Sequence, residues 1–265
     1  MSTTDETQRG DEKLVGSDRV LSVLTLLASQ PAGASLDELV RVSGHPKATV
    51  HRALASLQRA GLARKSGRGH YILGDEFLRL AFAHHEARPE HVRIRPLLQR
   101  LAERFGETAH FAVLDDHEVV YRAKVDPPTG AVRLTSTVGG RNPAHCTGVG
   151  KLLLSYRLRD VHDVEEWIDG RQLEKRTPNT ATTADELYSR IRTARAVGYS
   201  VDDQENEPGV NCIAFPVFLG SPTEPSGAVS ISALAYRTPI AELVAAADEI
   251  RAIIRDTTGA QELSA

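Results

Sequence analysis

Cysteine is scarce in this sequence, which contains two, Cys146 and Cys212, among 265 residues. Two cysteines are too few for a disulfide framework, and neither belongs to a CxxC motif. The four-coordinate set of a structural zinc site is therefore not expected, and no metal or cofactor is predicted. We interpret both cysteines as reduced thiols.

Long apolar runs are also missing from the chain. No segment approaches a run of about 18 apolar residues, the length that a membrane-spanning helix needs. Residues 1–13 are polar and hold no apolar signal region. The chain is 41% hydrophobic, so it can still bury a sizeable core, and its length suits two domains. We expect a cytoplasmic protein.

Acidic residues are absent between residues 39 and 74, although the whole chain has a formal net charge of −3. Such a positive stretch suits phosphate, because neutralising the backbone of a nucleic acid releases counterions. A run of charges is more often an ordinary solvated face. The secondary structure predicted around these residues is therefore needed to distinguish such a face from a nucleic-acid-binding surface. The basic residues of this stretch are Arg41, Lys47, Arg52, Arg59, Arg64, Lys65 and Arg68.

Two helices joined by a short turn are predicted at the start of this stretch. Ser35 and Glu38 have the spacing of a capping box, and Gly44 permits the left-handed conformation that ends many helices. Pro46 then suits the first turn of a second helix over residues 46–60. Val50, Leu54 and Leu57 mark its buried face, which leaves small and basic residues outside. This arrangement is typical of a helix-turn-helix, whose second helix enters the major groove.

A basic hairpin follows the second helix. Residues 62–65 and 70–73 are predicted as short strands, joined by a Gly-rich turn at 66–69. Together these elements form a winged helix-turn-helix, and the predicted partner is a double-stranded DNA operator. Groove contacts are predicted for Lys47, Thr49, His51 and Arg52. Contacts with phosphates or the minor groove are predicted for Arg64, Lys65 and Arg68.

The rest of the chain divides into segments of different character. Residues 1–16 are polar and are expected to be disordered, residues 17–74 form the winged helix, and residues 75–90 form a linker helix whose wide apolar side should pack on something. Residues 91–258 are predicted to form an α+β domain with an antiparallel sheet, because strands and helices follow one another without regular βαβ alternation. Residues 259–265 remain as a tail.

Within the second domain, the pattern predicts both helices and strands. The strands are expected at 110–114, 118–125, 199–201, 211–219 and 227–235, with a candidate strand at 132–136. A Gly-rich loop is expected at 139–143. The helices are expected at 91–105, 149–156, 161–168, 183–197 and 239–257.

Two stretches resemble the IclR family of bacterial transcriptional regulators. LVRVSGHPKATVHRAL (39–54) is similar to the family's helix-turn-helix, and GYSVDDQENEPGVNCIA (198–214) is similar to its C-terminal signature. The resemblance covers about residues 16 to 255. It implies a linker helix and a GAF-like effector-binding domain, and assembly into dimers or tetramers. The expected function is that of a ligand-responsive DNA-binding regulator, a repressor rather than an enzyme, that senses a small organic acid or aromatic metabolite.

The resemblance also implies a pocket in the second domain. Carried over by position, it would be lined by His145, Gly148, Val149, Asp202, Cys212, Ser230 and Ser232. A helix beginning at Gly148-Val149 would offer backbone N–H groups and a positive dipole end to a carboxylate. Ser230 and Ser232 are two apart on a strand and share a face. The family more often has Ala in place of Val149 and of Cys146, and a bulkier Val149 would narrow the pocket.

The same residues are compatible with other chemistries. Cys146 and Cys212 could instead make the second domain a thiol or redox sensor or an enzyme, although a cysteine on an apolar strand is more often a small buried hydrophobe. His145-Cys146 supplies two adjacent metal ligands where four are usual. Gly148 to Lys151 lacks the full phosphate-loop motif. Ser230, Asp202 and His145 lack the nucleophile elbow of a hydrolase, so no catalytic residue is assigned.

Overall fold

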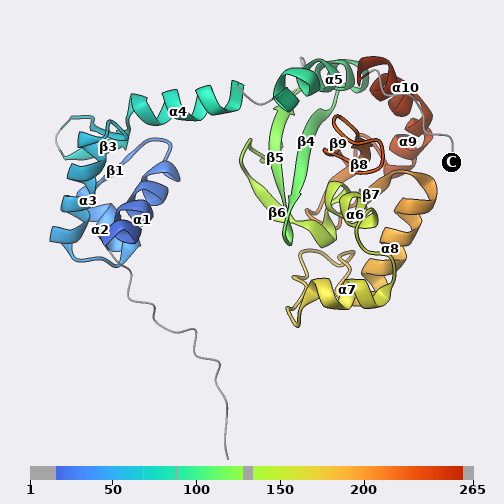
Figure 1. The fold of residues 1–265 in the computed structure, drawn as a ribbon, viewed down its shortest axis with the longest axis horizontal. Coiled ribbons are helices and arrows are strands. Elements are labelled where there is room, and N and C mark those ends of the chain that lie inside the picture. The colour runs from blue at the N-terminus through green and yellow to red at the C-terminus, as the bar shows by residue number, and fades with distance from the viewer. Residues whose placement is uncertain (1–15, 68, 87–88, 128–133, 259–265) are drawn as a thin grey trace, which may run out of the picture. The chain divides into compact units, whose positions relative to one another are not determined.

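The computed structural model describes residues 16–67, 69–86, 89–127 and 134–258. Contacts divide the chain into two compact units, residues 1–87 and 88–265, which are described separately below (Figure 1). Among the described residues, no helix combines the length and hydropathy needed to cross a bilayer.

The first unit has a core of three helices beside a three-stranded antiparallel sheet in the order β1-β3-β2. Aliphatic side chains of all three helices meet there, including Val23, Leu39 and Leu54. Its elements before the linker are α1 (Gly16–Ala28), β1 (Ala34–Ser35), α2 (Leu36–Ser43), α3 (Lys47–Arg59), β2 (Ala63–Lys65) and β3 (His70–Leu73).

Local sequence signals set the bounds of α2 and α3. Ser35 and Glu38 form the predicted capping box, and Gly44 adopts φ +68°, where its N–H bonds the carbonyl of Val40. Pro46 precedes α3 without a side-chain cap. The helix-turn-helix and its wing are thereby confirmed. The two-residue strand β1 was not predicted, because it exists only through pairing with β3.

The helix α4 (Asp75–Glu86) follows the wing and belongs to the first unit. Its apolar residues Leu78, Leu80 and Phe82 are 46%, 49% and 60% exposed. The packing expected for this apolar side is therefore not found within the described part of the chain.

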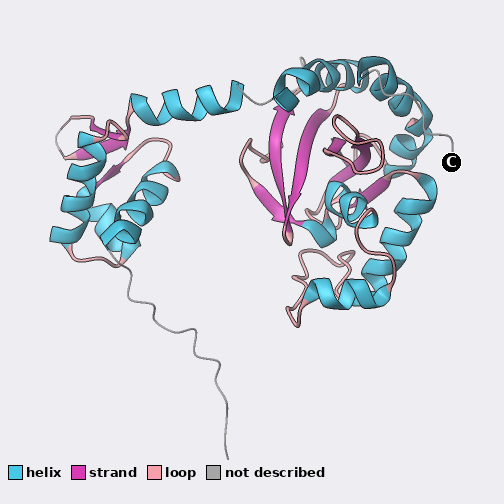
Figure 2. Ribbon diagram, in the orientation of Figure 1, coloured by secondary structure: helices cyan, strands magenta, loops and turns pink. Residues whose placement is uncertain are grey.

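The second unit is built around a six-stranded antiparallel sheet in the order β6-β5-β4-β9-β8-β7, shown in Figure 2. The strands are β4 (Thr108–Asp115), β5 (Glu118–Val125), β6 (Arg141–Pro143), β7 (Ser200–Asp203), β8 (Val210–Val217) and β9 (Gly227–Leu234). The helices are α5 (Pro89–Phe105), the 3-10 turn η1 (Ala144–Cys146), α6 (Gly148–Ser155), α7 (Val161–Ile168), α8 (Ala184–Val197), α9 (Ile240–Ala245) and α10 (Ala247–Thr258).

Helices cover both faces of this sheet. α5, α9 and α10 pack on one face, α6 and α8 pack on the other, and α7 packs against α8. The alternation of strand side chains supplies both cores, because the neighbours Ile213 and Ala214 of β8 lie in different clusters. The predicted α+β class with an antiparallel sheet is confirmed.

Three local predictions differ from the structure. Residues 134–136 form no strand, and the first part of the candidate strand at 132–136 lies outside the described residues. The expected loop at 139–143 contains the short strand β6, which pairs with β5. The single last helix is divided at Ala246 into α9 and α10.

Candidate functional site

The outer face of α3 carries the side chains predicted to enter the groove. Burial of Val50, Leu54 and Leu57 fixes the rotation of this helix. Lys47, His51 and Arg52 are consequently exposed, whereas Thr49 is half-buried. Three of the four predicted groove residues thus lie on the open face, with Thr49 at its edge.

Lys47 is joined to a residue that the sequence alone did not single out. Its ammonium lies 2.7 Å from Oδ1 of Asp37, in the first turn of α2. Both side chains are largely exposed, so this ion pair adds little to stability. It holds a carboxylate beside a predicted DNA contact.

On the wing, Arg64 and Lys65 belong to β2 and are exposed. The Lys65 ammonium lies 5.7 Å from the centre of the Tyr71 ring, a cation–π contact that limits its freedom. Arg68, the third predicted wing residue, lies outside the described residues.

A cavity of about 220 Å³ opens in the second unit beside the N-terminus of α6. Six of the seven predicted effector residues line it: Gly148, Val149, Asp202, Cys212, Ser230 and Ser232. His145 does not. It lies buried on η1, where its Nε2 is 3.0 Å from the carbonyl oxygen of Glu174. The N-terminus of α6 therefore reaches the cavity, whereas the imidazole of His145, on the turn before α6, does not.

The first turn of α6 brings backbone amides to the cavity. Thr147 caps the helix by accepting a hydrogen bond from the Gly150 N–H at 3.1 Å. The amides of Gly148 and Val149 belong to the same turn and have no acceptor within a helix that begins there. Gly150 allows this arrangement, because a Cβ at that position would overlap the carbonyl oxygen of Ala144. Such a helix end favours an anion.

A chain of hydroxyl, thiol and imidazole groups forms another part of the wall. Nε2 of His110 lies 2.8 Å from Oγ of Ser136, and its Nδ1 lies 3.4 Å from Oγ of Ser232. The Cys212 thiol donates to the same Ser232 hydroxyl at 3.1 Å. Burial, aided by Lys124, lowers the pKa of His110 to about 3. The imidazole is therefore neutral and offers hydrogen bonds instead of a positive charge.

Asp202 presents a carboxyl group to the cavity from β7. Its Oδ1 accepts hydrogen bonds from the backbone N–H groups of Glu205 at 2.7 Å and Asn206 at 3.3 Å. Burial raises the pKa of Asp202 to about 7, against the opposing effect of Lys151 and these amides. This carboxyl group can thus act as donor or acceptor near neutral pH.

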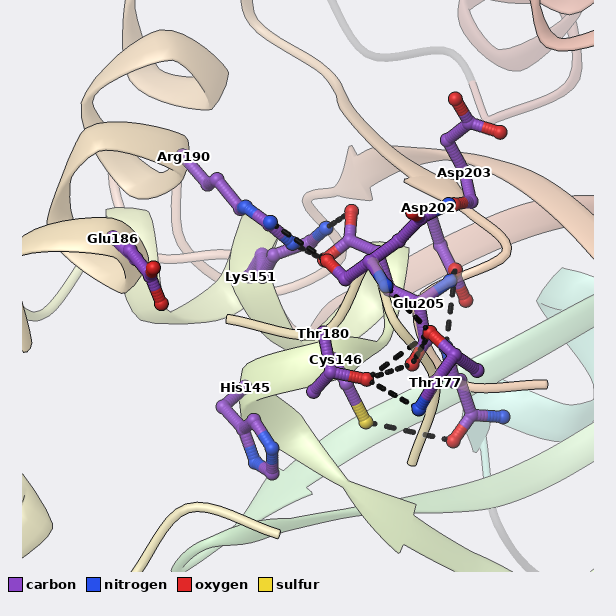
Figure 3. A network of polar contacts seen from close by, with 12 residues as sticks. His145, Cys146, Lys151, Thr177, Thr180, Glu186, Arg190, Asp202, Asp203 and Glu205 are labelled. Atoms are coloured by element: carbon purple, nitrogen blue, oxygen red, sulfur yellow. Dashed lines mark hydrogen bonds and ion pairs between the residues drawn. The ribbon is translucent and has the colours of Figure 1, made fainter. Parts of the chain in front are cut away.

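Behind Asp202 lies a buried ionic network, shown in Figure 3. Lys151 of α6 and Arg190 of α8 each form an ion pair with Glu205, and the Lys151 side chain is 1% exposed. The hydroxyl of Thr180 donates to the Glu205 carbonyl at 2.6 Å. Glu205 is therefore fixed through its side chain and its backbone, and it holds the loop that positions Asp202.

The cavity is also lined by two arginines that the sequence did not single out. Arg141 contributes to the wall while pairing with Asp115 and Glu118. The Nε of Arg176 donates to the carbonyl oxygen of Asn206 at 2.9 Å. Neither position lies in the sequence stretches that point to the pocket, so only the folded chain reveals these cations.

Family models match most of the chain. The model described as the IclR helix-turn-helix domain matches residues 17–67, and that of the bacterial transcriptional regulator IclR C-terminal domain matches residues 91–259. The chain belongs to the IclR family of transcriptional regulators. The first of its two units is accordingly a DNA-binding unit and the second an effector-binding unit. IclR-family proteins are regulators and not enzymes, as predicted for this chain.

Individual IclR-family proteins support the same assignment. The chain is 31% identical over 217 residues to the transcriptional repressor IclR of Escherichia coli K12, covering 81% of this chain and 78% of that repressor. A regulator from Rhodococcus sp. RHA1 superposes with a TM-score of 0.76 at 25% identity, covering 92% and 95% of the two chains. An IclR homologue of Microbacterium hydrocarbonoxydans, solved with 4-hydroxybenzoate, gives 0.71 at 22% identity over 91% and 100%, which shows a shared fold.

Cys146 of this IclR-family chain is buried, and Cys212 is half-buried at the wall of the cavity. Burial raises the pKa of Cys146 and of Cys212 above the ordinary thiol value. Thiolate, the reactive form, is thus scarce at neutral pH. Within the part of the chain that the structure describes, no group of three or more His, Cys, Asp or Glu residues could hold a metal ion.

Proposed function

We propose that the chain is a ligand-responsive repressor that binds a pseudo-palindromic operator as a homo-oligomer in the cytoplasm, and that a small organic acid or aromatic metabolite is its effector. One observation carries the proposal. The amides that open α6 and the hydroxyls of Ser230 and Ser232 line the same cavity of about 220 Å³.

The chemistry of this cavity supports an organic acid. The N-terminus of α6 and the nearby guanidinium of Arg176 favour a carboxylate at one wall. Ser232 and neutral His110 suit a hydroxyl or carbonyl group at another. An engineered protein cavity of about 150 Å³ holds benzene, so this volume accommodates an acid with a single ring. The 4-hydroxybenzoate bound by the Microbacterium homologue is a molecule of that class.

The proposed division of labour follows the sequence. Residues 17–74 would bind DNA, and residues 75–90 would link this DNA-binding unit to the rest of the chain. Residues 91–258 would bind the effector and form the contacts between copies of the chain in the oligomer. Two copies would place two α3 helices in successive major grooves, about 34–36 Å apart along the operator. Effector binding regulates only if it favours one arrangement of the two DNA-binding units over another. Repression is supported by the names of relatives such as the Escherichia coli repressor.

Selection of DNA from a random pool by the purified full chain tests the DNA part of this proposal. A palindromic consensus supports it, and the genes beside matching sites indicate which acids to screen. Salt-sensitive binding without sequence preference contradicts it, because phosphate contacts alone produce that behaviour.

The effector part is tested by titrating those acids against the operator-bound and the free chain. Unequal affinities are expected, and equal affinities for every acid that binds contradict regulation by these ligands. Ser232→Ala should weaken the response, since it removes a cavity hydroxyl. Ser189→Ala is the matched control, because Ser189 is exposed on α8 and does not line the cavity.

A further inference from the structure

An apolar hollow lies on the DNA-binding unit between the start of α2 and the first half of α3. Leu36 and Ala48 supply its apolar surface, and Lys47, His51 and Arg52 complete the lining. Leu36 is half-buried and packs against the core of the unit, whereas Ala48 is exposed. The hollow is thus a fixed feature of the surface and combines apolar and basic groups.

Local structure holds the walls of this hollow in place. Leu36 is the first residue of α2, directly after the capping box of Ser35 and Glu38. Ala48 stands in the first turn of α3, which is anchored by the burial of Val50 and Leu54. Both apolar groups are therefore positioned before any ligand arrives, and little ordering is needed for a contact to form.

The charges around the hollow indicate what it receives. Lys47 and Arg52 are cations, His51 is a hydrogen-bonding group, and Asp37 is the acid that pairs with Lys47. An apolar surface among basic side chains matches an apolar group carried by a polyanion. In the major groove of DNA, the bases offer one such group, the 5-methyl group of thymine, and alanine is a frequent partner for it.

We propose that the hollow formed by Leu36 and Ala48 receives the methyl group of one operator thymine and so makes these two residues determinants of sequence specificity. The inference rests on the proposed function, in which α3 occupies the major groove. Lys47 and Arg52 then lie beside that thymine, where they reach phosphates or the edge of a neighbouring base. Leu36 thereby adds a specificity contact from the first helix of the motif.

The test replaces each operator thymine in turn by deoxyuridine, which lacks the methyl group and keeps the base-pairing atoms. Binding of the full chain to each synthetic duplex is measured by fluorescence anisotropy at constant salt. One position in each half-site should raise Kd about fourfold, the effect expected for one buried methyl group. The other thymines should change Kd less than twofold.

Two variants link that position to the hollow. In Leu36→Ala and in Ala48→Gly the penalty for deoxyuridine should fall below twofold, because the methyl group has lost its partner. Ala48→Gly preserves the core and keeps the test valid if Leu36→Ala fails to fold. Ala55→Gly is its matched control on the same helix, since Ala55 does not line the hollow, and Val42→Ala is the control for Leu36→Ala. Both controls should retain the fourfold penalty.

The outcomes separate the two levels of the proposal. Binding without sequence preference overturns the proposed function itself. Sequence-specific binding that is insensitive to deoxyuridine at every position, or a penalty that persists unchanged in both hollow variants, overturns the inference alone. A change in oligomeric state in Leu36→Ala without any deoxyuridine effect would assign the hollow to a second copy of the chain.

Discussion

The carboxyl group of Asp202 is held by the backbone N–H of Glu205 at 2.7 Å, while the Glu205 side chain is itself fixed by Lys151 and Arg190. Three elements therefore fix the position of Asp202: the loop after β7, α6 and α8. A ligand that contacts Asp202 binds a residue that is already held in place. Substitutions can therefore test the charge of Asp202 and, separately, the ionic network that holds it in place.

Folding should change the charge that Asp202 carries in mildly acidic solution. Burial raises its pKa from 3.8 to about 7, so between these pH values the folded chain keeps a proton that the unfolded chain releases. The contribution of Asp202 to the free energy of unfolding should therefore fall as pH rises through this window, by on the order of 4 kcal/mol. Denaturant titrations followed by the fluorescence of Trp167, the single tryptophan, measure it. The difference between the wild-type and Asp202→Asn profiles should show this decrease, and parallel profiles for the two proteins would refute the assignment.

His110 should show the opposite pH dependence. Burial lowers its pKa from 6.5 to about 3, so between these values the unfolded chain binds a proton that the folded chain does not. The contribution of His110 to the free energy of unfolding should rise as pH increases from 3 to 6.5, and it offsets the decrease due to Asp202 where the two pH ranges overlap. His110→Gln removes this acid sensitivity and leaves the decrease due to Asp202 visible. If the variant is as sensitive to acid as the wild type, His110 is not the buried neutral group described above.

The ionic network that supports Asp202 should contribute to the stability of the effector-binding unit. Lys151→Met should destabilise the effector-binding unit by about 3 kcal/mol, because the buried Glu205 carboxylate loses one partner and keeps only Arg190. Lys175→Met is the control, since Lys175 is exposed, and it should change stability by less than about 0.5 kcal/mol. Trp167 fluorescence in urea reports both. Equal stability of the two variants would show that the network contributes nothing.

DNA binding should separate the two groups of basic residues. Arg52→Ala should cost about 1–3 kcal/mol on the operator and relax the selected sequence at one position, if Arg52 reads a base. Arg64→Ala should weaken binding to all sequences alike. It should also reduce the slope of log K against log salt concentration by about one. Anisotropy titrations at several salt concentrations measure both quantities. Uniform losses in both variants would place Arg52 on a phosphate instead.

The thiols should be dispensable for regulation. Because burial raises the pKa of Cys146 and Cys212, little thiolate is available to react at neutral pH. A Cys146→Ser/Cys212→Ser double variant should therefore bind operator DNA within twofold of the wild type, with or without mild peroxide treatment. A response to peroxide that disappears in the double variant would favour a thiol sensor.

The sequence predicts those features that depend on neighbouring residues. The capping boxes at Ser35 and Thr183 and the glycine stops at Gly44 and Gly198 mark the ends of α2 and α8 as the structure has them. The short strands β1 and β6 escaped prediction because each is stabilised by a partner strand elsewhere in the chain. The division at Ala246 has no Gly or Pro to signal it.

The candidate site shows the same limit. The spacing of Ser230 and Ser232 predicts a shared face, and both line the cavity. His110 joins them only through the register of β4 with β9, which no local pattern encodes. Three other features likewise bring together residues from separate elements. They are the pair of Asp37 with Lys47, the position of Arg176 at the cavity, and the network around Glu205. His145 was assigned by position within a motif, and the orientation of its side chain depends on the turn that carries it.

The pairing of β4 with β9 also has a consequence for biosynthesis. Thr108 lies opposite Ser232 in the centre of the sheet, so the early strands must wait for a partner near the end of the chain. At ribosomal rates of about 5–20 residues per second, that delay is on the order of 10 s. The DNA-binding unit, whose contacts are local, can fold well before then. A nascent chain would thus acquire its DNA-binding surface before the cavity proposed to regulate it exists.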